Sequence, residues 1–148
     1  MTMKLSTRVR YGCRAMLDLA QRNADGPVPL EALAEAQEIP VRYLAKIIQD
    51  LRRCGLIRSV RGAHGGYKLA VPPEDIKLLD VWEALDGPLC PVDCLDRPER
   101  CPRHDACVTR DVWEQVRGAM RAVLSNASLS DLAGRLEARE ARPPEDEP

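Results

Sequence analysis

Residues 41–55, VRYLAKIIQDLRRCG, predict an amphipathic helix with one apolar and one basic face. The apolar residues recur at three- and four-residue steps, the spacing that places side chains on one face of an α-helix. They are Val41, Leu44, Ile47, Ile48 and Leu51. We expect these residues to face a core, and the helix to begin near Pro40 and to end by Gly55, a residue type common at helix C-termini.

Residues 56–71, LIRSVRGAHGGYKLAV, predict a β-hairpin directly after this helix. Two short strands, Leu56–Arg61 and Tyr67–Val71, flank a tip that contains three glycines. We expect Gly62, Gly65 and Gly66 to supply the positive φ angles that a tight tip requires. The hairpin would project from the body as a two-stranded wing.

Two more helices are expected before residue 41. Helical spacing predicts the first from about residue 7 to Arg22, with Ser6 or Thr7 as its cap. Pro29 opens a short second helix, and Pro40 favours a tight turn between the second and third helices. This order of elements predicts a mainly α fold with a winged helix-turn-helix domain and a two-stranded wing.

The predicted fold indicates which residues would meet DNA. The second helix of a helix-turn-helix motif enters the major groove and presents its N-terminal residues to base edges. Here those residues are Arg42, Tyr43 and Lys46. The wing would bring Arg61 and His64 to the neighbouring backbone or minor groove, where negative potential favours arginine. The alternative is a three-helix core whose charged face is simply solvated.

The distribution of charge supports a polyanionic partner for the first half only. The chain has a net charge of −1, but residues 1–70 contain 12 Lys and Arg against 6 Asp and Glu, a net charge of +6. Residues 71–148 contain 10 against 17, a net charge of −7, and would repel a polyanion. With only two Trp, three Tyr and no Phe, the chain lacks the aromatic platforms typical of single-strand binders. We therefore expect double-stranded operator DNA as the partner.

The second half is predicted to contain three helices and a cysteine-rich loop. The helices are expected over Lys77–Leu85, from about Val108 to Leu124, and after a cap at Ser128 or Ser130. The long helix carries one apolar stripe, which includes Val112, Trp113, Val116, Met120, Val123 and Leu124. A small winged domain cannot cover this stripe, so we expect the helix to pair with its copy in a homodimer.

Four of the six cysteines lie within eighteen residues of a polar, proline-containing loop. They are Cys90, Cys94, Cys101 and Cys107. Thiols gathered in such a loop usually share a metal or an iron–sulfur centre. Four thiolates can close a tetrahedral zinc site, and they suit iron–sulfur clusters equally well, so their chemistry leaves both possibilities open.

The sequence also indicates a compartment. Its N-terminus lacks the apolar stretch of a signal peptide, and no apolar run approaches the ~18 residues that cross a bilayer. We expect a cytoplasmic protein with no membrane partner. Disulfides are disfavoured in the reducing cytoplasm.

The expected organisation is a DNA-binding domain (1–71), a short helix and cysteine-rich loop (72–107), a dimerisation helix with a C-terminal helix (108–141) and a disordered tail (142–148).

Several motifs, taken in order, resemble the winged-helix regulators of the IscR, NsrR and CymR type. They include KLST at 4–7, GPVPL at 26–30, SVRGAHGGYKL at 59–69, DVW at 80–82 and SLSDL at 128–132. The likeness covers nearly the whole chain short of the tail. It implies a homodimeric bacterial transcription regulator, and several such regulators hold a 2Fe–2S or 4Fe–4S cluster on three cysteines of this loop.

The resemblance also implies a ligand set. The three ligands implied are Cys94, Cys101 and Cys107. The chain departs from its relatives at the fourth ligand, because Arg110 stands where IscR-like proteins have histidine and Arg10 where NsrR-like proteins have aspartate. Cys90 is then a candidate as a fourth thiolate, and His104, an external small molecule or an open iron position are the alternatives.

Two classes of function follow from the sequence. The first is a transcription regulator whose affinity for its operator is controlled by an iron–sulfur cluster that senses iron–sulfur status, redox state or nitric oxide. The second is a zinc-stabilised or cluster-free winged-helix protein that acts as a thiol sensor or a protein-interaction module. No catalytic triad, metalloenzyme motif or glycine-rich phosphate loop is present in the sequence, so we predict that the protein is not an enzyme.

Overall fold

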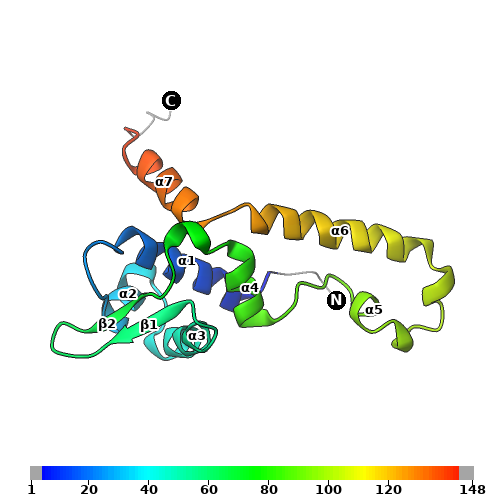
Figure 1. The fold of residues 1–148 in the computed structure, drawn as a ribbon, viewed down its shortest axis with the longest axis horizontal. Helices are drawn as coiled ribbons and strands as arrows, with labels where there is room; N and C mark the ends of the chain where they lie inside the picture. The colour runs from blue at the N-terminus through cyan, green and yellow to red at the C-terminus, as the bar shows by residue number, and fades with distance from the viewer. Residues whose placement is uncertain (1–4, 144–148) are drawn as a thin grey trace.

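The first half of the chain folds into three helices and a hairpin (Figure 1). The computed structural model describes residues 5–143. Its first elements are α1 (Thr7–Gln21), α2 (Leu30–Gln37), α3 (Val41–Arg53), β1 (Ile57–Val60) and β2 (Gly66–Leu69). Ser6 caps α1, since its hydroxyl accepts a hydrogen bond of 3.0 Å from the backbone N–H of Val9. The prediction of a mainly α fold with a two-stranded antiparallel wing is confirmed.

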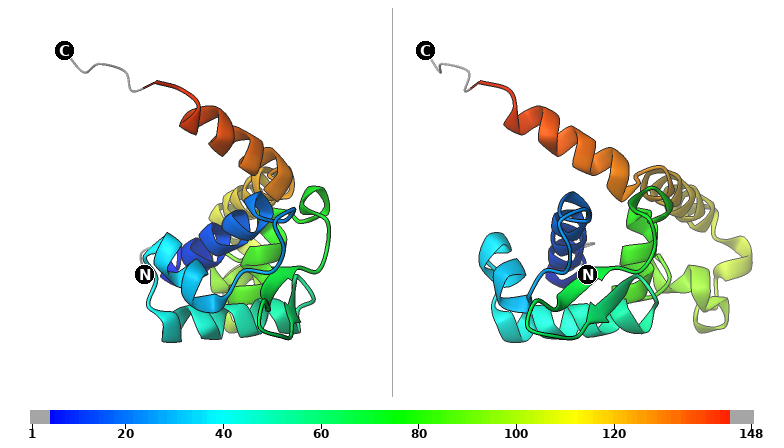
Figure 2. Two further views of the ribbon diagram at one scale, coloured as in Figure 1. Left: turned by 90° about the vertical axis from the view of Figure 1, so that its left-hand side faces the viewer. Right: turned by 60° about the vertical axis from the view of Figure 1, so that its left-hand side comes forward.

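The second half forms an arm and then returns to the body. Its elements are η1 (Pro73–Asp75), α4 (Leu78–Asp86), α5 (Asp93–Asp96), η2 (Pro98–Arg100), η3 (His104–Ala106), α6 (Val108–Ser125) and α7 (Leu129–Glu140). In Figure 1, α6 forms most of the length of the arm, and α5 lies near the end of the arm that is far from the body. The chain rejoins the body where the backbone N–H of Leu129 donates to the carbonyl of Ile76 at 2.9 Å, and α7 then projects outward (Figure 2).

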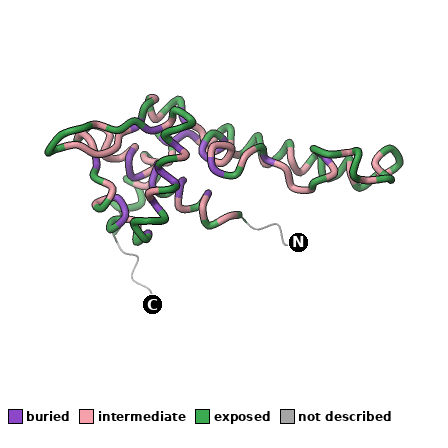
Figure 3. The backbone as a smooth tube through the Cα atoms, turned by 90° about the horizontal axis from the view of Figure 1, so that it is seen from below, coloured by how far each residue is buried: buried purple, intermediate pink, exposed green. Residues whose placement is uncertain are grey.

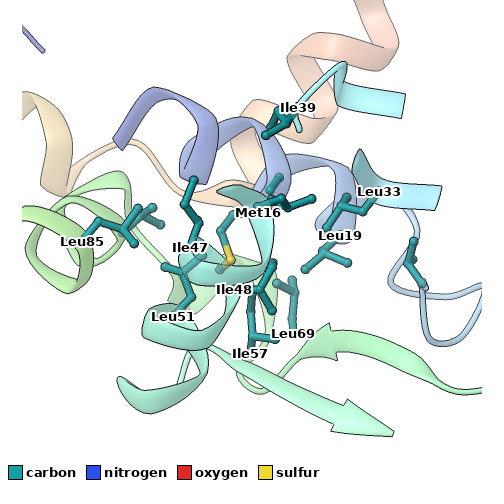
Figure 4. Packing of buried hydrophobic residues seen from close by; sticks show 14 of the residues in the cluster. Met16, Leu19, Leu33, Ile39, Ile47, Ile48, Leu51, Ile57, Leu69 and Leu85 are labelled. Carbon is teal, nitrogen blue, oxygen red and sulfur yellow. The ribbon is translucent and has the colours of Figure 1, made fainter. Parts of the chain in front are cut away.

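One hydrophobic core joins α1, α3, α4 and the base of the wing (Figure 4). Its largest fully buried side chains include Met16, Leu19, Leu33, Leu44, Ile47, Ile48, Leu51 and Ile57. Four of the five apolar residues predicted for the buried face of α3 are in this core. The prediction was wrong for Val41, which is 42% exposed because it begins the helix at the edge of the body.

The ends of α2 and α3 fix the direction of the DNA-facing helix. After α3, the N–H of Gly55 donates to Arg52 and that of Leu56 to Leu51, which satisfies the last carbonyls of the helix. Gly55 has a φ of 80°, so the predicted glycine stop is present. After α2, Glu38 takes the equivalent left-handed position with a φ of 54°, and Ile39 is buried. The turn between α2 and α3 is therefore tight and anchored in the core.

The wing is tied back to the body by backbone hydrogen bonds. Val28 and Tyr67 exchange N–H···O=C bonds of 2.8 and 2.9 Å, which adds a bridge to the two-stranded sheet. Gly62 and Gly66 have positive φ, as predicted. The expectation for Gly65 was wrong, since its φ is not positive; it is required because a Cβ there would overlap the carbonyl oxygen of Val60.

We expect Gly66→Ala to destabilise the fold by about 2–4 kcal/mol and to weaken DNA binding with it. Gly66 has a φ of 153°, and a Cβ would overlap the backbone carbonyl of Val28, which cannot move without breaking the bridge to Tyr67. Thermal or urea unfolding measures the loss. Gly134→Ala is the matched control, because its Cβ would meet no atom within 4 Å in an exposed helix. Equal stability of the two variants would contradict this account of the wing.

Exposure differs sharply between the body and the arm (Figure 3). None of the 18 residues of α6, all within the described part of the chain, is buried. The stripe predicted as one apolar face divides: Val116, Met120 and Leu124 are half-buried, whereas Val112 and Val123 are exposed.

Within residues 5–143, no helix is both long and apolar enough to cross a membrane. The predicted disorder of 142–148 falls mainly on 144–148, outside the described residues.

Candidate functional site

The residues predicted to contact DNA are all exposed. Arg42, Tyr43 and Lys46 lie on α3, on the side opposite its buried leucine and isoleucine residues. Arg61 and His64 lie between β1 and β2, where the wing turns. In every view of Figures 1 and 2, α3 and the wing form the underside of the molecule, far from α7. The structure thus places the two groups of predicted contacts on one side of the body.

The basic side chains of the underside are not neutralised by the single carboxylate of α3, because that carboxylate is already paired with other arginines. Asp50 is the only acidic residue of α3, and it forms ion pairs with Arg8 of α1 and, at 3.4 Å, with Arg53. These two arginines neutralise Asp50, while Arg42 and Lys46 form no ion pair within the described chain. The positive potential of the face is therefore available to an external anion.

A second pair of cations on the wing was missed by sequence reasoning. Arg58 and Lys68 are register partners on β1 and β2, and neither forms an ion pair within residues 5–143. Like charges directly opposite each other are unfavourable in a sheet unless an anion compensates them. Aligning the two predicted strands residue by residue could have revealed that Arg58 and Lys68 face each other. Side chains alternate between the two faces of a strand, and this alternation puts both residues on the outer face.

The cysteine loop contains three short helices and two buried leucines. Leu89 and Leu95 are 3% and 7% exposed and anchor it beside α4 and α6. Cys94 lies inside α5, Cys101 follows η2, and Cys107 is the N-cap of α6. The short helices α5, η2 and η3 thus space the thiols along the arm.

The four loop thiols are free but are not gathered. Each is half-buried, and no disulfide joins them in the described part of the chain. The Sγ of Cys90 donates to the carbonyl of Val92 at 2.9 Å, and the Sγ of Cys107 lies 3.1 Å from the Thr109 hydroxyl. Among residues 5–143, no three Cys, His, Asp or Glu side chains converge on a point where a metal could bind. The donors are of the right kind for a metal centre, but a shared centre requires the loop to close further.

The thiols differ in their readiness to ionise. The Thr109 hydroxyl and the backbone N–H of Arg110 lower the pKa of Cys107. Burial, followed by Asp96, raises the pKa of Cys90. Burial raises the pKa of Cys13 to about 11, and this small side chain packs against the core. Cys54 is exposed at the C-cap of α3.

Neither Arg10 nor Arg110, the two arginines singled out in the sequence, contacts a cysteine of the loop through a hydrogen bond of its side chain within the described residues. Arg10 is exposed on α1 and lies 3.5 Å from the Thr7 hydroxyl. Arg110 is half-buried in α6, and its Nε has no hydrogen-bond partner among the described residues. His104 pairs with the neighbouring Asp105 at 2.8 Å, on the same hollow as Cys107.

An ionic contact joins the cysteine loop to the long helix. Arg117 of α6 bonds to Asp96 of α5 at 2.9 Å and to Glu114 at 2.7 Å. One turn further on, Arg121 bonds to Glu83 of α4 at 2.8 Å. The segment that carries Cys94 is thus connected to α6, and α6 to the body.

Comparison with known proteins identifies this architecture. The family model described as "Rrf2: Iron-dependent Transcriptional regulator" matches residues 5–135. The chain belongs to the Rrf2 family. It is 45% identical over 130 residues to the protein rrf2 of Nitratidesulfovibrio vulgaris, covering 88% of this chain and 87% of that protein.

Solved Rrf2-family structures show the same fold. The structure of T. potens IscR matches with a TM-score of 0.80 and 39% identity, covering 97% of this chain and 95% of the other. The structure of CymR, the global cysteine regulator of B. subtilis, matches with a TM-score of 0.78 and 35% identity, covering 90% and 98%. The resemblance inferred from sequence motifs is confirmed. The protein is a DNA-binding transcriptional regulator, and since its relatives are regulators, the prediction that it is not an enzyme is also confirmed.

Proposed function

We propose that this Rrf2-family regulator binds operator DNA as a homodimer and that an iron–sulfur cluster on the cysteine loop sets its affinity. The observation that carries the DNA-binding part is the basic underside formed by α3 and the wing. Arg42, Tyr43 and Lys46 would reach base edges in the major groove, and Arg61 and His64 would contact the backbone or minor groove. All five side chains are exposed and free of the core.

The homodimer is supported by the exposed side of α6. Val108, Val112 and Val123 are 78%, 51% and 69% exposed on a helix with no buried residue among the 18 described. Ala119 and Ala122 are exposed on the same helix and would allow close approach of a second one. A two-fold pairing of α6 would bury these apolar groups and present two copies of α3 to a near-palindromic operator.

The cluster is supported by the chemistry of the donors. Cys94, Cys101 and Cys107 would supply three thiolates, and Cys90 the fourth. All four are free thiols; Cys90, Cys94 and Cys101 lie in or beside the short helices of the loop, and Cys107 caps α6. A bound cluster would supply a redox- and ligand-sensitive centre. Against Cys90 stands its raised pKa, caused first by burial and then by Asp96, which favours the protonated thiol.

Control of DNA binding would pass through the arm. Closing the loop moves α5, and the Asp96–Arg117 pair would carry that displacement to α6. Because α6 is the proposed dimer helix, its position sets the distance between the two α3 helices. A loop ordered only in the presence of its metal centre would then bias operator affinity.

A second candidate is a cluster-free thiol sensor or a zinc-stabilised protein. The observation that favours it is the dispersed arrangement of the thiols, together with the lowered pKa of Cys107, which favours the reactive thiolate form of that residue. Absorption spectra with iron, sulfide and zinc analysis of anaerobically purified protein separate the two candidates.

The DNA-binding face can be tested directly. We expect Lys46→Ala and Arg61→Ala each to weaken operator binding by about 1–3 kcal/mol if they read bases, or to lower the salt slope by about one if they contact phosphate. Both side chains are exposed, so the thermal midpoint should not change. Mobility shifts at several salt concentrations measure both effects. The control Arg135→Ala removes an exposed cation from α7 and should bind normally; unchanged binding in both test variants would contradict the assignment.

A further inference from the structure

Tyr43 does not stand alone on the DNA-facing side of α3. Its ring meets that of Tyr11 on α1 at a centroid distance of 5.8 Å and an interplanar angle of 82°. This edge-to-face geometry is one of the two that aromatic pairs prefer. Tyr11 is half-buried and Tyr43 is 36% exposed, so the contact lies at the surface. Tyr11 also packs against the hydrophobic core beneath it.

Tyr11 is held in turn by Arg14. The Arg14 guanidinium lies 5.6 Å from the centre of the Tyr11 ring, within the range of a cation–π contact. Arg14 also donates to the side-chain oxygen of Gln37 at 3.3 Å and to the Gln37 carbonyl, one of the unsatisfied carbonyls at the end of α2. Gln37 donates to buried Asp18 at 2.7 Å. One set of contacts therefore runs from the turn of the helix-turn-helix to the first turn of α3.

We propose that Tyr11, supported by Arg14, positions Tyr43 for sequence-specific reading of the operator. Tyr11 is thus a positioning residue on α1 and not itself a base contact. This inference rests on the proposed role of α3 in the major groove. Tyr43 is the third residue of α3, in the turn that meets base edges. Its hydroxyl offers a hydrogen bond and its ring an apolar surface for a thymine methyl group.

The physical reason is preorganisation. A tyrosine side chain that becomes ordered only on binding loses conformational entropy, which weakens binding. A contact that orders the side chain beforehand removes this penalty from the binding step. Tyr11 limits the rotamers of Tyr43 before DNA arrives. The benefit applies only where Tyr43 meets its matching base pairs, so it raises specific affinity more than non-specific affinity.

The test is a double-mutant cycle in the full-length protein. Operator DNA and an operator with substituted base pairs under α3 are titrated by fluorescence anisotropy with wild type, Tyr11→Leu, Tyr43→Leu and the double variant. We expect Tyr11→Leu to weaken operator binding about threefold to tenfold and to lower the preference for the operator by the same factor. The double variant should bind no more weakly than Tyr43→Leu. Tyr11→Phe, which keeps the ring, should restore wild-type preference.

Other outcomes overturn the inference in distinguishable ways. If wild type prefers the operator but the effects of Tyr11→Leu and Tyr43→Leu simply add, Tyr11 does not act through Tyr43. If Tyr11→Leu weakens binding to both DNAs equally, its role is only structural. If wild type shows no preference for the operator, the proposed DNA reading itself fails. Should Tyr11→Leu not fold, Arg14→Met removes the support from behind Tyr11, and an unchanged operator preference in that variant also overturns the proposal.

Discussion

Protein purified without air is expected to be brown and to contain iron and sulfide, and Cys94→Ala, Cys101→Ala and Cys107→Ala are each expected to lose most of both. Each substitution removes one of the three proposed thiolate ligands, which weakens the attachment of a cluster to the loop. Within residues 5–143, His104 is the only histidine of the loop, and it pairs with Asp105. Absorption and circular dichroism spectra with iron and sulfide analysis measure the loss.

Cys90→Ala distinguishes the two ligand sets. A labile or spectrally shifted cluster would assign Cys90 as the fourth ligand, and an unchanged spectrum would remove it from the site. Cys13→Ala and Cys54→Ala are the controls, since Cys13 packs against the core and Cys54 lies at the end of α3, on the body. Colourless wild-type protein with stoichiometric zinc, and DNA affinity indifferent to oxygen or nitric oxide, would replace the cluster with the zinc-stabilised alternative.

Val112→Asp is expected to convert the dimer into monomers and to abolish operator binding at micromolar concentration. Val112 is 51% exposed on the face of α6 that we assign to the partner, so a carboxylate there would be buried unpaired in both copies. The penalty for uncompensated buried charge is several kcal/mol, which corresponds to a loss of about a thousandfold or more in dimer affinity. Light scattering coupled to size-exclusion chromatography measures the mass.

Ser125→Asp serves as the matched control, because it adds the same charge at an exposed residue in the last turn of the same helix, beyond the valines. It should remain dimeric and bind the operator. A monomeric wild type that still binds a full palindrome tightly would show that α6 is not the dimer helix. Since Val112 is largely solvated in the single chain, the variant should keep the helical spectrum of the wild type.

Local patterns in the sequence determined the elements of this protein and their order. The three- and four-residue spacing of α3, the proline before it and Gly55 after it specify a helix and its ends through interactions within a few residues. The glycines of the wing tip likewise predict a hairpin. Gly65, however, is required because the Val60 carbonyl oxygen lies close to its backbone, and not because of a positive φ. The motifs were also sufficient to place the chain in its family, because they span almost its whole length.

Tertiary structure alone decided which faces of those elements meet. Periodicity placed Val112 and Val116 on one stripe of α6, but the packing of α6 against α4 and α5 leaves Val112 exposed and Val116 half-buried. The pairing of Arg117 with Asp96, and of Tyr43 with Tyr11, joins residues 21 and 32 positions apart, which no local pattern encodes. Cysteine spacing indicated a shared centre, whereas the short helices of the loop hold the thiols apart. Local spacing specifies an element because the forces that form it act between neighbouring residues, whereas contacts between elements depend on how the whole core packs.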